Sequence, residues 1–158
     1  MNSSEDLHSL CIEKNISLST AESCTSGALA SAFTSISGSS SFFRGGLVAY
    51  QNEIKIKCLG IPESIIKERT VVCSDVAEKM AENVRLKFSS DFSISTTGYA
   101  GPLGGTDSNP VGTVFIAVSS KKRSVSKRFF FKGDRASIIS QAVVNSISFL
   151  YSELKSYK

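Results

Sequence analysis

A serine at the junction between a predicted strand and a predicted helix is the residue of this sequence best placed to do chemistry. Ser23 follows the strand-like run 16–21 and precedes a segment with helical periodicity at 25–34. The N–H groups of a first helical turn lack intrahelical partners, so they can stabilise a developing oxyanion or hold a phosphate. Ser23 is therefore a candidate nucleophile. The alternative is that it only caps the helix, a position for which serine is strongly favoured.

A serine nucleophile needs a base. His8 is the single histidine and lies on a peripheral N-terminal helix, so a histidine-rich metal site is excluded and the base must be a lysine, a carboxylate or a tyrosinate. Lys55 lies five residues past Tyr50, in the first turns of a predicted helix and between two isoleucines. It could act as a base only if desolvation lowered its pKa from about 10.4 toward 7–8. The alternatives are a surface lysine and, for Tyr50, packing instead of a part in proton transfer.

The four cysteines, at positions 11, 24, 58 and 73, show no C-x-x-C spacing, which argues against a zinc or redox site. Cys24 is a rival nucleophile, but it lacks a histidine partner and is more simply explained as a small packed residue. Scattered cysteines are typical of reduced thiols in a cytosol. Residues 1–6 are polar and acidic, the reverse of a secretory signal, and no apolar run approaches the ~18 residues of a membrane span. We therefore expect a cytoplasmic protein without a metal, another cofactor or a membrane partner.

A glycine-rich stretch and one arginine are the candidate ligand-binding elements. Residues 98–112 contain five glycines and two prolines and cannot form regular structure. The stretch lacks the ending of a Walker loop and does not open a helix; a backbone-lined anion or ligand cradle and a simple turn both fit it. Arg135 lies at the start of the last predicted helix, where it could bind a phosphate through two N–H groups or be an ordinary exposed arginine.

The charge of the chain gives little support to a nucleic-acid partner. The formal net charge is +4, and the densest basic stretch, 121–123, is interpreted as a solvated hairpin tip. A mildly basic chain attracts anionic small molecules such as phosphates. A nucleic-acid-binding function would rest on the net charge alone, so we expect none.

The predicted elements place the candidate residues at one edge of a sheet. Helices are expected at 3–15, 25–34, 52–60, 74–88 and from 134 onward, strands at 16–21, 47–50, 92–97, 111–119 and 124–131, and a loop at 35–44. This interleaving predicts an α/β fold with a mixed, mainly parallel sheet covered on both faces, and one antiparallel pair at its end. A length of 158 residues suits one domain. Ligands of such sheets bind beyond the carboxyl ends of the strands, where Ser23, Tyr50, Lys55 and Thr97 would meet.

Eight separated motifs together resemble a known family. They lie at 20–25 (TAESCT), 38–40, 44–45, 50–55 (YQNEIK), 97–102 (TGYAGP), 104–105, 110–113 (PVGT) and 133–135 (GDR). In this order they resemble the C-terminal domain of CinA, the competence/damage-inducible protein, whose stand-alone members are nicotinamide-nucleotide amidases (PncC-like). The likeness extends from about residue 5 to residue 154, so the whole chain, 1–158, is expected to be one such amidohydrolase domain.

The resemblance implies a three-layer α/β/α sandwich and the hydrolysis of nicotinamide mononucleotide to nicotinate mononucleotide and ammonia, in pyridine nucleotide salvage. In that family the serine of the A-E-S-C-T run is the nucleophile, which corresponds to Ser23, and the Y-x-N-x-x-K run supplies Tyr50 and Lys55. We expect Tyr50 to take part in the proton relay and N–H groups near Ser23 and Thr25 to hold the oxyanion. The expected substrate-binding residues are Thr25, Thr97, Gly98, Gly101, Gly104, Gly105 and Arg135.

The sequence departs from the family pattern at three positions, which we expect to affect substrate affinity more than the reactivity of Ser23 and Lys55. Ser26 replaces a glycine, Tyr99 replaces a small aliphatic residue, and Asn109 replaces a lysine before Pro110. The rival function is a non-catalytic nucleotide-binding or regulatory module related to competence or damage response. A binding module would not require Ser23, Tyr50 and Lys55 together. The sequence leaves the oligomeric state open, homo-oligomers included.

Overall fold

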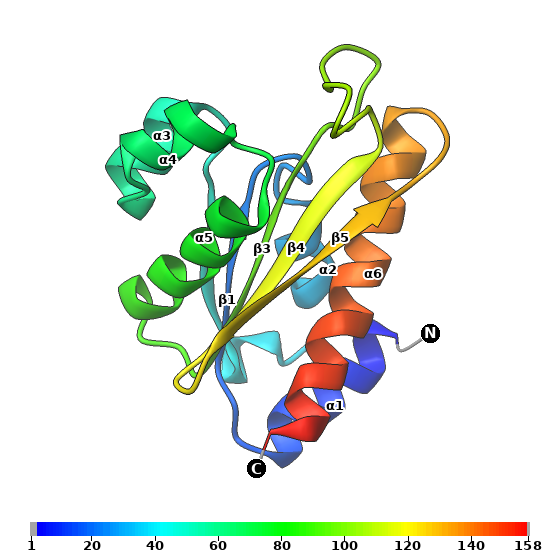
Figure 1. Ribbon diagram of the computed structural model, residues 1–158. Coiled ribbons are helices and arrows are strands. Elements are labelled where there is room, and N and C mark those ends of the chain that lie inside the picture. The colour runs from blue at the N-terminus through cyan, green and yellow to red at the C-terminus, as the bar shows by residue number, and fades with distance from the viewer. Residues whose placement is uncertain (1–2, 158) are drawn as a thin grey trace.

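A five-stranded sheet in the order β2-β1-β3-β4-β5 forms the centre of the computed structural model, which describes residues 3–157 (Figure 1). The strands are β1 (Leu18–Glu22), β2 (Phe43–Val48), β3 (Phe92–Gly98), β4 (Thr113–Ser120) and β5 (Ser124–Phe130). β1 pairs in parallel with β2 and β3, whereas β3 with β4 and β4 with β5 are antiparallel. The predicted mixed sheet is confirmed, with two antiparallel pairs where the sequence indicated one.

Helices cover both faces of the sheet, which gives the predicted α/β/α sandwich (Figure 1). They are α1 (Ser4–Glu13), α2 (Ala28–Thr34), α3 (Asn52–Leu59), α4 (Glu63–Arg69), α5 (Ser74–Lys87) and α6 (Arg135–Ser156), with a 3-10 helix η1 at Ser39–Ser41. On one face α5 packs against the strands, with α3 and α4 beside it; on the other lie α6, α1 and α2. No helix within residues 3–157 combines the length and apolar character needed to cross a bilayer.

A row of hydroxyl groups attaches α5 and the segment before it to β3. Ser93 and Ser95 donate to the main-chain oxygens of Ala81 and Ala77 in α5. Small side chains at both positions of the helix let it approach the sheet closely, and the hydrogen bonds satisfy hydroxyls that are fully buried. Further along the same strand, Thr97 donates to the Val71 oxygen over 2.7 Å. The strand that ends at the candidate site therefore also fixes the chain that faces it.

The second strand differs from the prediction. We expected a strand at 47–50 after a loop at 35–44, but β2 runs over Phe43–Val48 with alternating half-buried and exposed residues. It is an edge strand, so it lacks the continuous apolar run that marks a buried one. Gly46 is required there because a Cβ at this position would lie 2.1 Å from the Thr20 hydroxyl oxygen of β1. Glycine in this strand therefore marks close backbone approach, not a loop.

The residue types also predict Asn52 and Ser74 as helix N-caps, and this prediction is wrong. Gln51 and Cys73 occupy the N-cap positions of α3 and α5, and neither makes a side-chain cap hydrogen bond. Asp134 does cap α6, where its side chain accepts the Ser137 N–H over 2.9 Å. α4 was not predicted, because its seven residues carry too short an apolar pattern to show a period.

Candidate active site

A cavity of about 220 Å³ lies beyond the carboxyl ends of β1 and β3, at the sheet edge expected from the topology. It brings together chain segments that are far apart in the sequence. Its lining residues are Ser23, Cys24, Tyr50, Asn52, Lys55, Val71, Val72, Thr97, Gly98, Tyr99, Ala100, Gly101, Leu103 and Arg135. Among these described residues there are two cationic side chains and no carboxylate, so the cavity favours an anionic ligand.

Ser23 and Lys55 are in direct contact inside this cavity. The Nζ of Lys55 lies 2.9 Å from the Oγ of Ser23 and donates a second hydrogen bond of 3.0 Å to the main-chain oxygen of Tyr50. Ser23 directly follows β1, and Lys55 is the fourth residue of α3, the helix that follows β2. Both side chains are buried, with relative exposures of 8% and 1%. A hydroxyl hydrogen-bonded to a buried amine is the arrangement of a nucleophile and its base.

Burial lowers the pKa of the Lys55 ammonium from 10.5 to about 8, against a smaller opposing influence of the Cys24 thiol. Removing an ammonium from water disfavours its charged form, and no carboxylate lines the described cavity to restore it. Lys55 is therefore partly uncharged near neutral pH. An uncharged amine has the lone pair that a general base needs.

Cys24 is unsuited to nucleophilic attack. Its side chain is 6% exposed, and burial raises the pKa of its thiol to about 12. The reactive form of cysteine is the thiolate, which such an environment suppresses. The interpretation of Cys24 as a small packed residue agrees with this geometry.

Ser23 is not the helix cap of the alternative interpretation. α2 begins at Ala28, and Gly27 is its N-cap residue. Ser23 lies instead at the start of a turn, where its own N–H donates to the Thr96 oxygen over 3.0 Å. That N–H is consequently not available to an oxyanion. The N–H groups of Cys24 and Thr25 donate to no other residue within 3–157, so they remain as candidate oxyanion donors; of the two residues, Cys24 lines the cavity.

The Thr25 side chain does not contact the cavity, contrary to the prediction. Its hydroxyl donates to Glu22 Oε2 over 2.6 Å and lies 2.8 Å from the Thr96 hydroxyl. Thr97 lines the cavity, although its hydroxyl is engaged with Val71. The threonines of this site thus hold the main chain in place.

The glycines of the loop within 98–112 have two roles: some line the cavity, and others allow the loop to pack against itself. Gly98 and Gly101 line the cavity, whereas the predicted binding residues Gly104 and Gly105 lie outside the lining. A Cβ on Gly105 would lie 2.8 Å from the Val111 nitrogen, so this glycine serves the close packing of the loop on itself. The prediction for the last two glycines is corrected accordingly.

Tyr50 and Arg135 form one side of the cavity mouth. Arg135 donates from Nη2 to the Tyr50 hydroxyl over 2.7 Å and from Nη1 to the Gly101 oxygen over 2.8 Å. The Tyr50 side chain is 52% exposed and makes no hydrogen bond to Ser23 or Lys55 among the described residues. Its main-chain oxygen, not its phenol, contacts the lysine. The expected proton relay through the Tyr50 side chain is therefore not supported by the contacts.

Several residues of the site were missed by sequence reasoning. Val71 and Val72 form a wall of the cavity, and no local pattern marks them. Asn109, noted before only as a missing positive charge, donates to the Val72 oxygen over 3.1 Å and accepts a hydrogen bond from Arg128. Glu22 is buried beside Ser23 at the end of β1. A glutamate within a buried strand was the one available signal.

The turn that carries Ser23 contains a strained residue that a substitution can test. Ser26 is exposed and has φ +52, a left-handed conformation that costs a non-glycine residue about 1 kcal/mol. Glycine loses more backbone entropy on folding, which offsets part of the gain. We expect Ser26→Gly to raise the free energy of unfolding by up to about 1 kcal/mol, measured by urea denaturation.

The matched control is Ser9→Gly, at an exposed position inside α1. It should lower the free energy of unfolding by about 0.5 kcal/mol, because glycine is the poorer helix former. A loss of stability in Ser26→Gly as large as that in the control would contradict the strain at Ser26.

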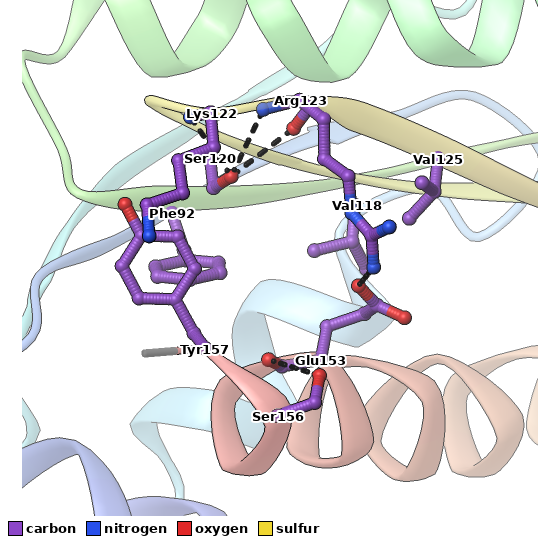
Figure 2. A pocket seen from close by; sticks show the side chains of 9 residues that line it. All are labelled: Phe92, Val118, Ser120, Lys122, Arg123, Val125, Glu153, Ser156 and Tyr157. Carbon is purple, nitrogen blue, oxygen red and sulfur yellow. Dashed lines mark hydrogen bonds and ion pairs between the residues drawn. The ribbon is translucent and has the colours of Figure 1, made fainter.

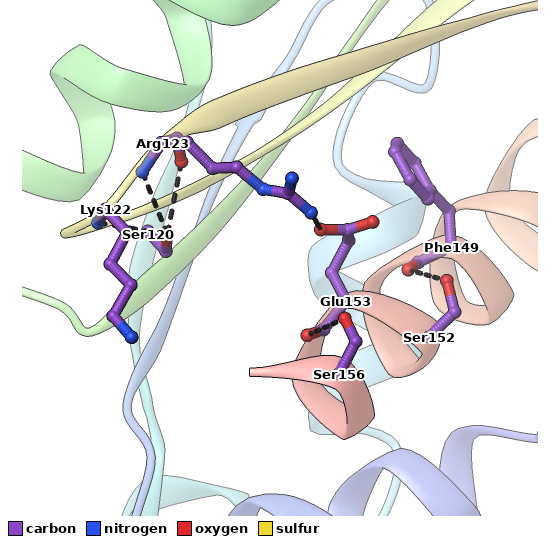
Figure 3. Close-up of polar contacts among 7 residues, drawn as sticks. All are labelled: Ser120, Lys122, Arg123, Phe149, Ser152, Glu153 and Ser156. Carbon is purple, nitrogen blue, oxygen red and sulfur yellow. Dashed lines mark hydrogen bonds and ion pairs between the residues drawn. The ribbon is translucent and has the colours of Figure 1, made fainter. Parts of the chain in front are cut away.

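A larger cavity, of about 350 Å³, lies at the opposite end of the sheet, between the β4–β5 turn and the end of α6 (Figure 2). Its polar groups are engaged with one another: Arg123 pairs with Glu153 over 3.0 Å, and the Ser120 hydroxyl accepts from the main chain of the turn (Figure 3). The Lys122 ammonium lies 4.8 Å from the Tyr157 ring centre. This cavity holds no nucleophile–base pair among its described lining residues, so its size does not make it the reactive site.

Comparison with known proteins matches nearly the whole chain to one protein family. The family model described as the CinA C-terminal domain matches residues 2–154. A CinA-like protein of Flavobacterium psychrophilum is 45% identical over 152 residues, which cover 96% of this chain and 36% of that protein. One of Shewanella pealeana is 48% identical over 117 residues, covering 74% and 28%. The chain thus spans about a third of the length of the curated relatives it matches.

Solved structures give the same result over whole chains. The competence damage-inducible protein A of Klebsiella pneumoniae superposes with a TM-score of 0.93 at 28% identity, covering 99% of this chain and 100% of that one. A competence-damaged protein superfamily member from Escherichia coli gives 0.89 at 32% identity, covering 95% and 90%. The sheet order and helix layers described above are therefore shared with these proteins.

Proposed function

Because the chain belongs to the CinA C-terminal domain family, we propose that it is an amidohydrolase whose Ser23 and Lys55 deamidate nicotinamide mononucleotide to nicotinate mononucleotide and ammonia. The observation that carries this proposal is the buried contact of 2.9 Å between Ser23 Oγ and Lys55 Nζ. A lysine in this environment has its pKa lowered to about 8, within the range of a working base.

The proposed reaction is acyl transfer in two steps. Uncharged Lys55 accepts the Ser23 hydroxyl proton while Oγ forms a bond to the carboxamide carbon, and the carbonyl electrons move to its oxygen. The N–H groups of Cys24 and Thr25 stabilise that oxyanion, an effect worth about 3 kcal/mol per donor in other acyl-transfer enzymes. The Lys55 ammonium then returns its proton to the amide nitrogen as the C–N bond breaks, and ammonia leaves. Water, deprotonated by Lys55, releases the acid and restores Ser23.

The proposed phosphate contact is Arg135 at the cavity mouth. Its guanidinium is already oriented by Gly101 and Tyr50, so little side-chain entropy remains to be lost on binding an anion. A bidentate arginine–phosphate pair is among the stronger charged hydrogen bonds. In the proposed binding mode the anionic end of a mononucleotide lies at the mouth and the carboxamide lies at Ser23.

Arg135→Met should weaken binding of the mononucleotide selectively. We expect KM for nicotinamide mononucleotide to rise about 10- to 100-fold, the equivalent of a lost charged hydrogen bond, with a much smaller change for nicotinamide riboside, which lacks the phosphate. Steady-state ammonia release with both substrates measures the difference. Arg123→Met, at the far end of the sheet, is the control and should change neither KM. An equal loss for both substrates would show that Arg135 acts through the shape of the mouth.

The function itself is tested by measuring ammonia release from nicotinamide mononucleotide, nicotinamide riboside and NAD in parallel. The proposal expects the mononucleotide to have the highest kcat/KM, because it alone combines a single phosphate with an unencumbered nicotinamide. Saturable binding of the mononucleotide with no ammonia from any of the three would overturn the enzyme assignment. It would favour the nucleotide-binding module instead.

A further inference from the structure

A buried glutamate organises the turn that carries Ser23. Glu22 is the last residue of β1 and is 1% exposed. Its Oε2 accepts the Thr25 hydroxyl over 2.6 Å and the N–H groups of Gly27 and Leu29, both over 3.0 Å. Its Oε1 accepts the Ala30 N–H over 2.8 Å. One side chain thus connects the end of a strand to the start of a helix across the intervening turn.

All four partners of Glu22 are donors, which only an acceptor-only group can satisfy. A carboxylate accepts at both oxygens, whereas a glutamine would direct an NH₂ group at one of the same donors. Burying a carboxylate is unfavourable unless its hydrogen bonds are met, and here the unpaired N–H groups at the start of α2 meet them. The N-cap residue of that helix, Gly27, has no side chain to do so.

A second set of contacts fixes the same turn to the neighbouring strand. The Thr25 hydroxyl lies 2.8 Å from that of Thr96, and the Ser23 N–H donates to the Thr96 oxygen over 3.0 Å. The residues between the strand and the helix are therefore held from both sides. The main-chain N–H groups of Cys24 and Thr25 are left with no other partner within residues 3–157.

We propose that Glu22 is a positioning residue for the reaction at Ser23. Through Thr25 and the first N–H groups of α2, it holds the turn so that Ser23 Oγ stays within reach of Lys55 and two N–H groups stay free for the oxyanion. Glu22 itself contacts neither Ser23 nor Lys55 among its hydrogen-bond partners. This role of Glu22 rests on the proposed function, because only attack by Ser23 on a substrate requires the turn to be held rigidly.

The first test compares Glu22→Gln with the unchanged protein in steady-state ammonia release from nicotinamide mononucleotide. A displaced nucleophile should cost about 100-fold in kcat, because misplacement by an ångström has effects of that size. KM should change little, since Arg135 is untouched, and the pH at which the rate levels off should stay where Lys55 sets it. A role in stability alone would leave kcat of the folded fraction unchanged.

A pair of substitutions at Thr25 keeps the test decisive if Glu22→Gln does not fold. Thr25→Val keeps the shape of threonine but removes the hydroxyl that Glu22 and Thr96 share, whereas Thr25→Ser keeps the hydroxyl. We expect kcat of the valine variant to be about tenfold below that of the serine variant. Thr34→Val, at the exposed end of α2, is the control for losing a threonine hydroxyl. Equal kcat for the two Thr25 variants would overturn the proposal.

Labelling of Ser23 by a fluorophosphonate separates this proposal from the proposed function. The probe reports the reactivity of the hydroxyl without requiring the nucleotide substrate. If the unchanged protein releases no ammonia but is labelled, and the Thr25→Val variant is labelled more slowly than Thr25→Ser, the substrate assignment fails and the role of Glu22 stands. Equal labelling rates in folded variants, with ammonia release intact, would remove the role of Glu22 alone.

Discussion

Replacement of Ser23 by alanine is expected to abolish ammonia release from nicotinamide mononucleotide while leaving the fold intact. The substitution removes the one oxygen that attacks the carboxamide, and losing the nucleophile costs other serine hydrolases about 10⁴-fold or more in kcat. The Ser23 N–H keeps its bond to the Thr96 oxygen, so the turn retains its main-chain anchor. Stability should consequently change far less than activity.

The measurement is ammonia release together with mass spectrometry of the intact protein and of its peptides after quenching during turnover. The unchanged protein should carry a transient nicotinoyl-nucleotide adduct on the peptide containing Ser23, and the alanine variant should carry none. Ser152→Ala, on α6 and remote from the cavity, is the matched control and should keep full activity (Figure 3). Turnover at the wild-type rate in Ser23→Ala would eliminate the covalent mechanism. Residual turnover in Ser23→Ala that disappears when Cys24 is also replaced by alanine would assign the attack to Cys24.

Replacement of Lys55 by methionine should have two opposite effects, a loss of activity and a gain in stability near neutral pH. Lowering the pKa of this lysine from 10.5 to about 8 corresponds to a cost of about 3 kcal/mol for carrying its charge in the folded protein. Methionine fills similar space without that charge. The Tyr50 oxygen and Ser23 Oγ each lose a donor, so we expect a net gain of about 1 to 2 kcal/mol in the free energy of unfolding at pH 7.

The direction of the pH dependence follows from the lowered pKa. Below about pH 8 Lys55 is charged in both the folded and the unfolded state, and the full cost of burying the charge is present. Between about 8 and 10.5 the unfolded chain binds more protons than the folded one, so the stability of the unchanged protein rises with pH. Urea denaturation at pH 7 and pH 9.5 should show the advantage of Lys55→Met shrinking. An advantage independent of pH would contradict the charge as its cause.

The rate profile gives the independent check. A base that must be uncharged predicts that log kcat/KM rises with pH and levels off above about 8. The Lys55→Met variant should lose the activity, and with it the rise of log kcat/KM below about pH 8. A flat profile between pH 6 and 9 in the unchanged protein would exclude Lys55 as the base.

The meeting of Ser23 and Lys55, 32 residues apart, could be predicted from the sequence because it follows from a general rule. Parallel strands that lie side by side, as β1 and β2 do, deliver the residues after them to the same edge. What the rule does not give is orientation. Tyr50 follows β2 as expected, but its phenol turns toward Arg135 and only its main-chain oxygen reaches the lysine.

Features that depend on contact between distant segments were beyond sequence reasoning. The strand at 47–50 was predicted to start later than β2 does, because the loop rich in serine and glycine was expected to extend to residue 44. Gly46, which lies inside β2, is required by its close neighbour Thr20 on β1. Glu22 could not be assigned a role from the sequence, because its four donors belong to a turn and a helix start whose shape the residue types do not reveal. Val71 and Val72 come to the cavity through hydrogen bonds to Thr97 and Asn109.

The cavity wall formed by Val71 and Val72 is attached separately from the pair of Ser23 and Lys55. Val71 and Val72 are attached to β3 and to the glycine loop by hydrogen bonds from Thr97 and Asn109. Other contacts hold the reactive pair: Glu22, Thr25 and Thr96 fix the turn that carries Ser23, and α3 carries Lys55. The width of the cavity and the contact between Ser23 and Lys55 therefore depend on different side chains. Substitutions at Thr97 or Asn109 are therefore expected to change the width of the cavity while leaving the contact between Ser23 Oγ and Lys55 Nζ in place.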